Sequence, residues 1–319
     1  MLKTILNRLL QIIPTILVVV SITFVITRMI PGNPAATVLG PQASVEDVEK
    51  LTEELGLNDS LWDQYIRYLG NLFKGDFGTS YSYNMPVMNL IFSRLPNTLI
   101  IAFTSIVLAV LIGIPIGIVS AVKQYTAFDY ISMVLALIGV SMPIFWLGLM
   151  LVLLFSVNLG WLPSLGMGSI EIGLWDVISH MVLPVGCLAT IPTATFARIT
   201  RSSMLEVINA EYIKSLRAGG LKERSVIYRH ALKNALPPIV TVLGMQLASS
   251  FTGAILTETI FSWPGMGTLI VGAIENRDYM LIQGTVLFTA LAFVFINLIV
   301  DIVYMMINPK VNYSGKGGA

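Results

Sequence analysis

Few side chains in this sequence have the types and spacing that chemistry on a substrate requires. Cys187 is the only cysteine, so neither an intrachain disulfide nor a cysteine metal knuckle can form. The two histidines, His180 and His230, stand far apart, and neither has a partner at metal-ligand spacing. Glu258 and Asp301 are too distant in sequence to be claimed as a catalytic dyad. We therefore predict neither a catalytic residue nor a metal site.

A nucleotide site is not predicted either. A P-loop needs a strand, a glycine-rich turn ending in Lys and Ser or Thr, and a helix, because backbone amides must surround the phosphates. The nearest string, Ser314-Gly315-Lys316-Gly317, lies in a C-terminal stretch without that context. We expect this chain to hold no cofactor and to have no ATPase activity of its own.

The most informative segment is basic rather than catalytic. Between Arg198 and Lys233 the sequence has eight Lys or Arg and three acids. Helical periodicity appears before Gly219-Gly220 and again after it, which predicts a helix, a turn and a second helix. Its cations are suited either to lipid headgroups or to a protein that docks on the loop, and charge alone favours the lipid headgroups.

Composition shows what must position this loop. Of the 319 residues, 55% are hydrophobic and only 12% are charged, and the mean hydropathy is +0.80. A soluble domain has a charged fraction of about 25%. Most of the surface is therefore expected to face lipid, and the chain is predicted to be an all-α polytopic membrane protein.

Six apolar runs are long enough to cross about 30 Å of hydrocarbon, and helix is the only conformation that satisfies their backbone there. The predicted spans are 9–30, 97–121, 129–157, 177–200, 237–261 and 281–307. Several contain Pro or Gly, which membrane helices tolerate as kinks or points of close packing. The apolar core of the first run exceeds a signal peptide's usual 7–15 residues, so we interpret it as an uncleaved helix.

Lys and Arg in the short loops predict the orientation. With the N-terminus in the cytoplasm, the basic loop also lies inside. The short outer loops, 158–176 and 262–280, then contain a single Lys or Arg, which is Arg277. The C-terminus is then cytoplasmic as well. The long segment 31–95 lies outside.

The outer segment 31–95 is predicted to contain two amphipathic helices. Ser44 can cap a helix whose apolar residues share one face and which ends at Gly56, and a second apolar pattern runs from Leu61 to Gly75. The segment could be a structural cap on the bundle or a docking surface for an external partner. The sequence favours neither.

The basic loop resembles the coupling loop of ABC importer permeases, and most narrowly that of the dipeptide, oligopeptide and nickel branch. The matching residues are Glu211-Tyr212-Ile213, Arg217-Ala218-x-Gly220-Leu221 and Arg229-His230-Ala231-Leu232-Lys233-Asn234-Ala235-Leu236. The resemblance covers nearly the whole chain. It includes Arg28-x-x-Pro31-Gly32-x-Pro34, Gly75-Asp76-Phe77-Gly78-x-Ser80, Arg94-Leu95-Pro96-x-Thr98-Leu99, Ser141-x-Pro143-x-Phe145-Trp146, Glu258-x-Ile260-Phe261-x-x-Pro264-Gly265-x-Gly267 and Asp301-x-x-Tyr304.

This resemblance implies a type I ABC importer permease fold with about six transmembrane helices, in a bacterial inner membrane. It divides the chain into a first helix (1–30), an extracytoplasmic helical segment (31–95), a five-helix core (96–307) with the coupling loop at 201–236, and a cytoplasmic tail (308–319). The residues it assigns to ATPase coupling are Glu211, Tyr212, Arg217, Ala218, Gly219, Gly220, Leu221, Arg229 and His230.

The same resemblance implies a set of partners. They are a second homologous permease, two cytoplasmic ATPase subunits that bind ATP and Mg²⁺, an external substrate-binding protein and membrane lipid, but no nucleic acid. Peptides are the expected cargo, with nickel or a metal chelate as the alternative. The loop departs from the family at Ser215-Leu216, where a Thr-Ala pair is usual, and the outer segment departs at Ser60, where Pro is frequent.

Three other classes remain as alternatives: an intramembrane enzyme, for which no catalytic dyad was found above, a secondary transporter and a channel. A secondary transporter would need ionisable groups within its spans and an internal repeat. A channel would need a filter motif or a ring of pore-lining residues. The sequence has few charges within its predicted spans, and we find no internal repeat, filter motif or ring of pore-lining residues in it.

Arg28 and Glu258 are expected to reach similar depths near the outer membrane face, judged from a rise of about 1.5 Å per helical residue. A lone carboxylate at such a depth is costly and tends to find a cation or water. Each could reach the interface independently. Alternatively, Glu258 pairs with Arg28, or less favourably with Arg94, and the pair holds an outer gate shut.

Overall fold

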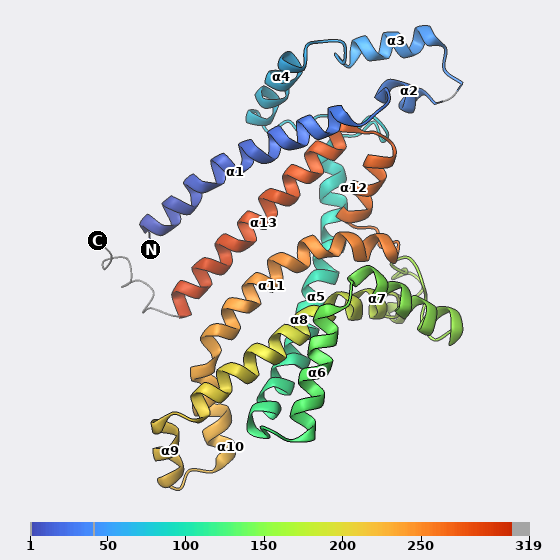
Figure 1. Ribbon diagram of the computed structural model, residues 1–319. Helices are drawn as coiled ribbons and strands as arrows, with labels where there is room; N and C mark the ends of the chain where they lie inside the picture. Colours follow the sequence, from blue (N-terminus) through green and yellow to red (C-terminus); the bar gives the residue numbers. More distant parts are fainter. Residues whose placement is uncertain (1, 41, 308–319) are drawn as a thin grey trace. The chain divides into compact units, whose positions relative to one another are not determined.

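The computed structural model describes residues 2–40 and 42–307, and helices dominate it (Figure 1). The described chain forms two compact units. Unit 1 contains Leu99–Trp263 together with residues 295–307, and unit 2 contains Leu2–Thr98 and Pro264–Val294. In this division residues 264–294 group with the N-terminal part of the chain, and the predicted segments stay a prediction. The predicted tail, 308–319, lies outside the described residues.

Unit 2 begins with the long helix α1 (Leu2–Met29), whose side chains are described from Ile13. Three short helices follow: α2 (Pro34–Leu39), α3 (Val45–Glu54) and α4 (Leu61–Phe73). The unit also contains the start of α5 (Val87–Val122), all of α12 (Met266–Glu275) and most of α13 (Tyr279–Ile307).

The two amphipathic helices predicted in segment 31–95 are confirmed as α3 and α4. The Ser44 hydroxyl accepts a hydrogen bond from the Asp47 amide at the start of α3, and Ser60 does the same for Asp63 at the start of α4. Each cap satisfies an amide that has no partner within the helix. Ser60 therefore has a definite role at the position where the family frequently has Pro.

In unit 2, hydrogen bonds of buried polar residues connect α5 and the segment before it to α12 and to the start of α13. The Asp278 carboxylate is fully buried and accepts hydrogen bonds from the Ser80 hydroxyl at 2.6 Å and the Leu281 amide at 3.1 Å. The Thr98 hydroxyl accepts from the Met266 amide at 2.8 Å. Around these bonds lies an apolar core from α5, α12 and α13, made of Val87, Leu90, Ile91, Met266, Leu269, Ala273, Leu281 and Ile282.

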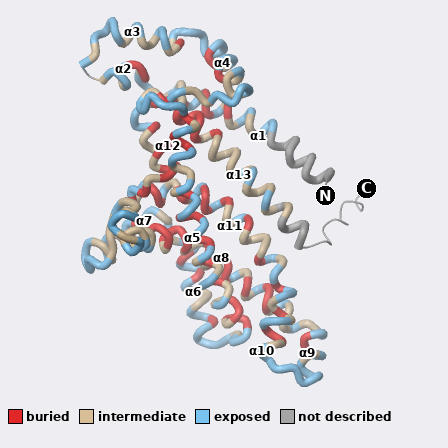
Figure 2. Tube along the Cα trace, turned by 180° about the vertical axis from the view of Figure 1, so that it is seen from behind, coloured by how far each residue is buried: buried red, intermediate tan, exposed pale blue. Residues whose placement is uncertain are grey.

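Unit 1 is built around α8 (Leu174–Ile208), which lies against α11 (Leu232–Ile260), α6 (Ala127–Ser141) and α7 (Ile144–Leu151). Buried residues occur along most of α8 (Figure 2). A π-helical stretch, η1 (Val152–Asn158), extends α7. The shorter elements α9 (Glu211–Ala218), α10 (Glu223–Ser225) and η2 (Val226–Ala231) connect α8 to α11.

Two glycines let α5 approach the backbone of α8. A Cβ atom at Gly113 would lie 2.6 Å from the Thr193 carbonyl oxygen, and one at Gly117 would lie 2.6 Å from that of Ala197. Their spacing is the Gly-x-x-x-Gly pattern with which membrane helices pack closely. Glycines in the spans were expected to be kinks or points of close packing, and Gly113 is a point of close packing. Gly117 lies in the same contact between α5 and α8.

The predicted span 129–157 is not a continuous helix. It breaks between Ser141 and Ile144, and the helical stretches on the two sides are bent by 105°. Met142 has an extended backbone (φ −74°, ψ 129°) because the ring of Pro143 disfavours the helical region for the residue before it. Proline was expected to kink this span, and the structure shows a complete break.

By length and apolarity, four of the described helices can cross a membrane, or five if the bent pair counts as one span. The four are Val87–Val122, Leu174–Ile208, Glu223–Ile260 and Tyr279–Val300. In α1 the described apolar stretch, Ile13–Met29, is shorter than the length required of a span. The all-helical membrane fold is therefore confirmed, whereas the count of six spans stays a prediction.

Candidate functional site

The basic loop forms a helical hairpin between α8 and α11, with α9 and α10 at its tip (Figure 1). Its inner side is an apolar cluster made of Ile118, Ala121, Met204, Ile213, Val226, Ile227, Ala231 and Ala235. Ile213 and Val226, one on each arm, are fully buried. Burying such a side chain stabilises a structure by about 1.5–3 kcal/mol. The hairpin is therefore folded onto α5 and α8 within unit 1.

The turn of the hairpin lies where the sequence predicted it. Gly219 ends α9 with an ordinary φ of −72°, and Gly220 follows with φ +79°. A positive φ is easily adopted only by a residue without a Cβ atom. The amides of Gly220 and Leu221 then donate to the carbonyl oxygens of Arg217 and Leu216, at 3.0 and 3.3 Å.

An ion pair spans this turn. The Arg217 guanidinium donates two hydrogen bonds to the Glu223 carboxylate, at 2.7 and 3.1 Å. These bonds hold the pKa of Glu223 below its usual value. Arg217 was predicted to contact an ATPase, but its guanidinium also joins the two arms of the hairpin across the turn.

A second bond joins the hairpin to α11. The Asn234 side-chain amide donates to the Tyr212 hydroxyl at 2.7 Å. On α9 itself, Lys214 donates to the Glu211 carboxylate at 2.7 Å. Tyr212 and Asn234 both belong to the motif that resembles ABC permeases, and in this structure they form a bond between the two arms of the hairpin.

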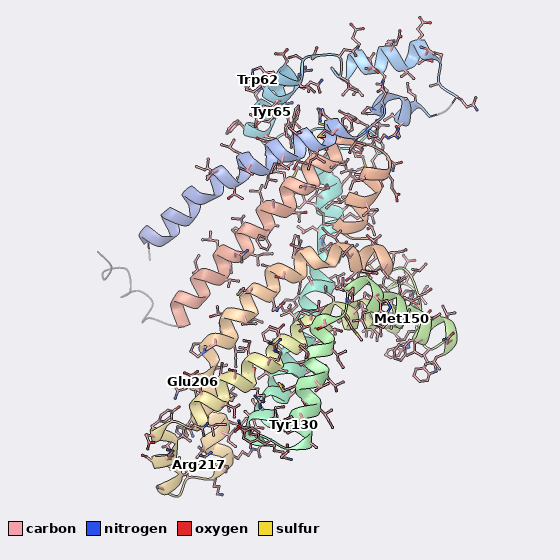
Figure 3. The ribbon with its side chains drawn as sticks, viewed as in Figure 1. Trp62, Tyr65, Tyr130, Met150, Glu206 and Arg217 are labelled. Carbon is pink, nitrogen blue, oxygen red and sulfur yellow. The ribbon has the colours of Figure 1, made fainter. Side chains whose placement is uncertain are left out.

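The predicted coupling residues lie together on the outside of the hairpin, with one exception. Glu211, Tyr212, Arg217, Ala218, Gly219, Gly220, Leu221 and Arg229 are exposed, and His230 is half-buried. Tyr228 is also exposed, at 53%, although its position was not assigned. Apolar surface from Tyr212, Leu221 and Tyr228 therefore lies among exposed cations. Figure 3 shows the Arg217 side chain at this tip.

One charged pair near the hairpin was not expected from the sequence. Asp129, at the start of α6, is 2% exposed and accepts two hydrogen bonds from Arg201 of α8, at 2.6 and 2.7 Å. Asp129 also accepts a bond from the Tyr125 amide at 3.1 Å. Arg201 is thus a structural cation rather than a member of the exposed basic surface. The sequence did contain a signal for this pair, because Asp129 is an isolated acid at the start of the predicted span 129–157.

The two residues of the predicted outer gate belong to different units. Arg28 lies near the end of α1 in unit 2, where its Nε donates to Gln64 Oε1 at 3.2 Å and its guanidinium lies 4.4 Å from the centroid of the Phe24 ring. Glu258 lies near the end of α11 in unit 1 and is fully buried. Their pairing stays a prediction.

Two family models match this chain, one over its N-terminal third and the other over most of the rest. Residues 113–313 match the binding-protein-dependent transport system inner membrane component. Residues 1–102 match the model for the N-terminal part of such membrane components.

Similar proteins align over almost the entire chain. A dipeptide transport system permease, DppB of Alkalihalophilus pseudofirmus, is 46% identical over 98% of this chain and 100% of its own length. An oligopeptide transport system permease, AppB of Bacillus subtilis, is 41% identical over 97% of this chain and 99% of its own.

The fold is also that of a solved transporter. An inward-facing structure of the MetNI methionine ABC transporter contains a chain with a TM-score of 0.57 and 17% identity. The match covers 69% of the present chain and 97% of the other. With both family models and near-complete relatives in agreement, the chain belongs to the family of binding-protein-dependent transport system inner membrane components.

Proposed function

We propose that this chain is one of two permease subunits of an ABC importer for short peptides, and that the α9–α10 hairpin receives the motion of a cytoplasmic ATPase. The observation that carries the coupling role is the hairpin itself. Its outer residues are exposed, while Ile213 and Val226 are buried and the Arg217–Glu223 pair spans the turn. Such a loop can transmit force because it resists deformation.

The chemistry of the exposed tip suits a protein partner. Protein interfaces are enriched in aromatic residues and Arg relative to the rest of a protein surface. Tyr212, Leu221 and Tyr228 provide the apolar contact area, and Arg224 and Arg229 lie exposed beside them. We expect the ATPase to present a groove with apolar walls and acidic residues at its rim.

A binding-protein-dependent permease works with an external binding protein and an ATPase. The proposed complex contains this chain, a second homologous permease, two ATPase subunits and one external binding protein. ATP and Mg²⁺ belong to the ATPase subunits. In the proposed orientation both termini are cytoplasmic, which places the hairpin on the ATPase side and the α2–α4 segment on the side of the binding protein.

The printed names of the relatives support peptides as cargo. A dipeptide permease and an oligopeptide permease are 46% and 41% identical to this chain over nearly its full length. We therefore favour peptides over nickel or a metal chelate.

Two measurements on the membranes of the native organism test this function. An affinity tag on the chain should copurify an ATPase subunit, a second permease and an external binding protein. In proteoliposomes containing the complex, ATP should drive uptake of a radiolabelled dipeptide, and unlabelled dipeptide should compete with it. ATP-driven uptake of ⁶³Ni²⁺ without dipeptide uptake would reject the peptide assignment. Isolation of the chain without any ATPase would reject the coupling role.

A further inference from the structure

A cavity of about 700 Å³ lies in unit 2 between the end of α1 and α4. The residues that line it are Ser21, Phe24, Val25, Arg28, Met29, Gly32, Asn33, Pro34, Thr52, Leu57, Asn58, Leu61, Trp62, Gln64, Tyr65 and Tyr279. Most are apolar or aromatic, and Figure 3 shows Trp62 and Tyr65 on α4. The proposed docking of the ATPase at the hairpin does not use this cavity.

Among the described residues, Arg28 is the only charged one that lines the cavity, and no described acid lines it with Arg28. In the described part of the chain its hydrogen bonds go only to neutral oxygens, Gln64 Oε1 at 3.2 Å and Thr27 Oγ1 at 3.3 Å. A guanidinium has five N–H donors, so donors remain for an anion. The cavity therefore has an uncompensated positive charge.

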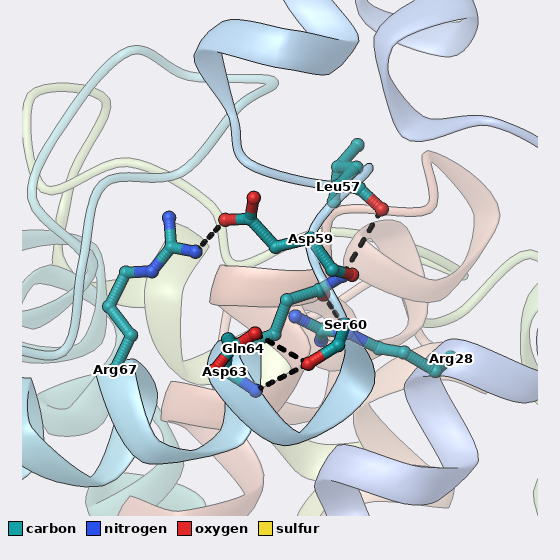
Figure 4. A network of polar contacts seen from close by, with 7 residues as sticks. All are labelled: Arg28, Leu57, Asp59, Ser60, Asp63, Gln64 and Arg67. Atoms are coloured by element: carbon teal, nitrogen blue, oxygen red, sulfur yellow. Dashed lines mark hydrogen bonds and ion pairs between the residues drawn. The ribbon is translucent and has the colours of Figure 1, made fainter.

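This charge is held in position by its surroundings. The guanidinium lies over the rings of Phe24 and Tyr279, 4.4 and 5.1 Å from their centroids. Gln64, which accepts the bond from Arg28, donates in turn to the backbone oxygens of Leu57 and Asp59, at 3.1 and 2.9 Å (Figure 4). Because these contacts restrict the Arg28 side chain in advance, an anion bound there costs less conformational entropy.

The walls of the cavity continue into apolar surface that the described chain leaves uncovered. On α1, Val25 and Met29 line the cavity and are 54% and 75% exposed, and Val18 and Ile22 extend the exposed face along the same helix. On α4, Trp62 is 69% exposed. Tryptophan and tyrosine gather where membrane proteins meet the headgroups of the bilayer. Apolar α1 surface next to a lone cation fits a molecule with an anionic head and long apolar tails.

We propose that this cavity is a binding site for an anionic phospholipid, whose headgroup contacts Arg28 and whose acyl chains lie along the exposed face of α1. Arg pairs well with phosphate oxygens because its planar fork matches their geometry. Trp62 and Tyr65 border the headgroup. A lipid bound here would stabilise α4, whose Tyr65 hydroxyl is already hydrogen-bonded to Ser21 of α1 at 2.7 Å.

Quenching of Trp62 fluorescence tests the site directly. The full chain, purified in a neutral detergent, is titrated with phosphatidylglycerol or phosphatidylcholine that carries a nitroxide near the headgroup. The Trp62 signal is obtained by subtracting the spectrum of the Trp62→Phe variant. We expect phosphatidylglycerol to quench Trp62 at about fivefold lower concentration, since one cation near an anionic lipid contributes about 1 kcal/mol.

Variants assign the preference to Arg28. Arg28→Gln should make the two lipids equivalent, and Arg28→Lys should retain most of the difference. Arg67→Gln is the matched control, because Arg67 is an exposed cation of α4 that pairs with Asp59 and does not line this cavity. It should leave the preference unchanged. Equal quenching by the two lipids in the unmodified chain, or a preference that survives in Arg28→Gln, would overturn the proposal.

A final arm separates a lipid from a soluble carboxylate. Dialanine at millimolar concentration should not relieve quenching by phosphatidylglycerol. If dialanine relieves it and dialanine amide does not, the cavity binds a peptide carboxylate and the lipid assignment is wrong. This result would leave the proposed importer function intact, because that function is tested separately by uptake and copurification.

Discussion

At the scale of single residues, the backbone torsion at Gly220 determines the shape of the hairpin tip. A Cβ atom at this position would meet nothing within 4 Å. Substitution is therefore opposed by backbone strain alone, because φ is +79°. For an L-residue other than Gly this region costs about 1–2 kcal/mol, and a β-branched residue is affected most.

We expect Gly220→Val to leave the permease in the membrane but to weaken ATPase docking, so that transport and substrate-stimulated ATP hydrolysis fall together. Gly219→Ala is the matched control, because Gly219 has φ −72° and should couple normally. Gly220→Asn should be intermediate, since Asn tolerates positive φ better than Val. Copurification of the ATPase with each variant measures docking. Normal coupling by Gly220→Val would remove the main support for assigning this loop.

The Arg217–Glu223 pair makes the turn sensitive to acid. Its hydrogen bonds lower the pKa of Glu223 below 4.5, so the pair stabilises the folded turn above about that pH and the contribution is lost as pH falls through the lowered pKa. Because both side chains are partly exposed, at 37% and 53%, the effect should be at most about fivefold in an opening equilibrium.

Hydrogen exchange of the Gly220 and Leu221 amides, corrected for the intrinsic rate at each pH, measures this opening. Protection should fall between pH 6 and pH 3 in the unmodified chain. Glu223→Gln, which cannot ionise, should show at both pH values the low protection that the unmodified chain shows at pH 3. If Glu223→Gln follows the same pH dependence as the unmodified chain, another acid controls the turn.

At the scale of helices, the close contact of α5 with α8 depends on residues without side chains. A Cβ atom at Gly117 would lie 2.6 Å from the Ala197 carbonyl oxygen and 2.6 Å from the Thr200 Cβ. Overpacking of this kind usually costs about 1–3 kcal/mol. We therefore expect Gly117→Leu to lower the thermal unfolding temperature of the detergent-solubilised chain.

Gly186 of α8 provides the comparison, since a Cβ there meets nothing within 4 Å. Gly186→Leu should leave the unfolding temperature close to that of the unmodified chain. Equal destabilisation by both substitutions would show that the α5–α8 contact is not the cause, because replacing Gly with Leu raises helix propensity and does not by itself destabilise a helix.

Local patterns predicted the helices well but predicted their breaks and partners poorly. The start of α3 at Ser44 and of α4 near Leu61 follow from caps and apolar spacing within a few residues. The 105° bend at Pro143 was expected only as a kink, because hydropathy over 129–157 does not change at the break. The pairing of Asp129 with Arg201 joins positions 72 residues apart, which no local pattern specifies.

At the scale of the whole molecule, the orientation in the membrane is the first property to measure. We expect a cysteine at Asn58 to be labelled by a membrane-impermeant maleimide in intact spheroplasts, and one at Lys222 to be labelled only after lysis. Both residues are exposed, and the native Cys187 is buried. Labelling of Lys222→Cys but not Asn58→Cys in intact cells would reverse the orientation.

The predicted outer gate is tested by a double-mutant cycle on basal ATP hydrolysis by the complex, without binding protein. If Glu258 pairs with Arg28, then Glu258→Gln and Arg28→Gln should each raise the basal rate. The exchange Arg28→Glu with Glu258→Arg should recover at least part of the resting rate. Additive effects would separate the two residues and leave Arg28 to the cavity of its own unit.

The second arm of the hairpin is continuous with a long helix of unit 1. From Glu223 to Ile260 the chain is helical without interruption, which corresponds to a rod of about 57 Å at 1.5 Å per residue. Pro237 and Pro238 lie about 21 Å along this helix from Glu223, where they remove backbone hydrogen bonds and leave a weak point at which the helix can bend. A rotation of about 5° at that point would move the far end, about 35 Å away, by roughly 3 Å. A bend at the two prolines would thus change the position of Glu258 relative to the hairpin.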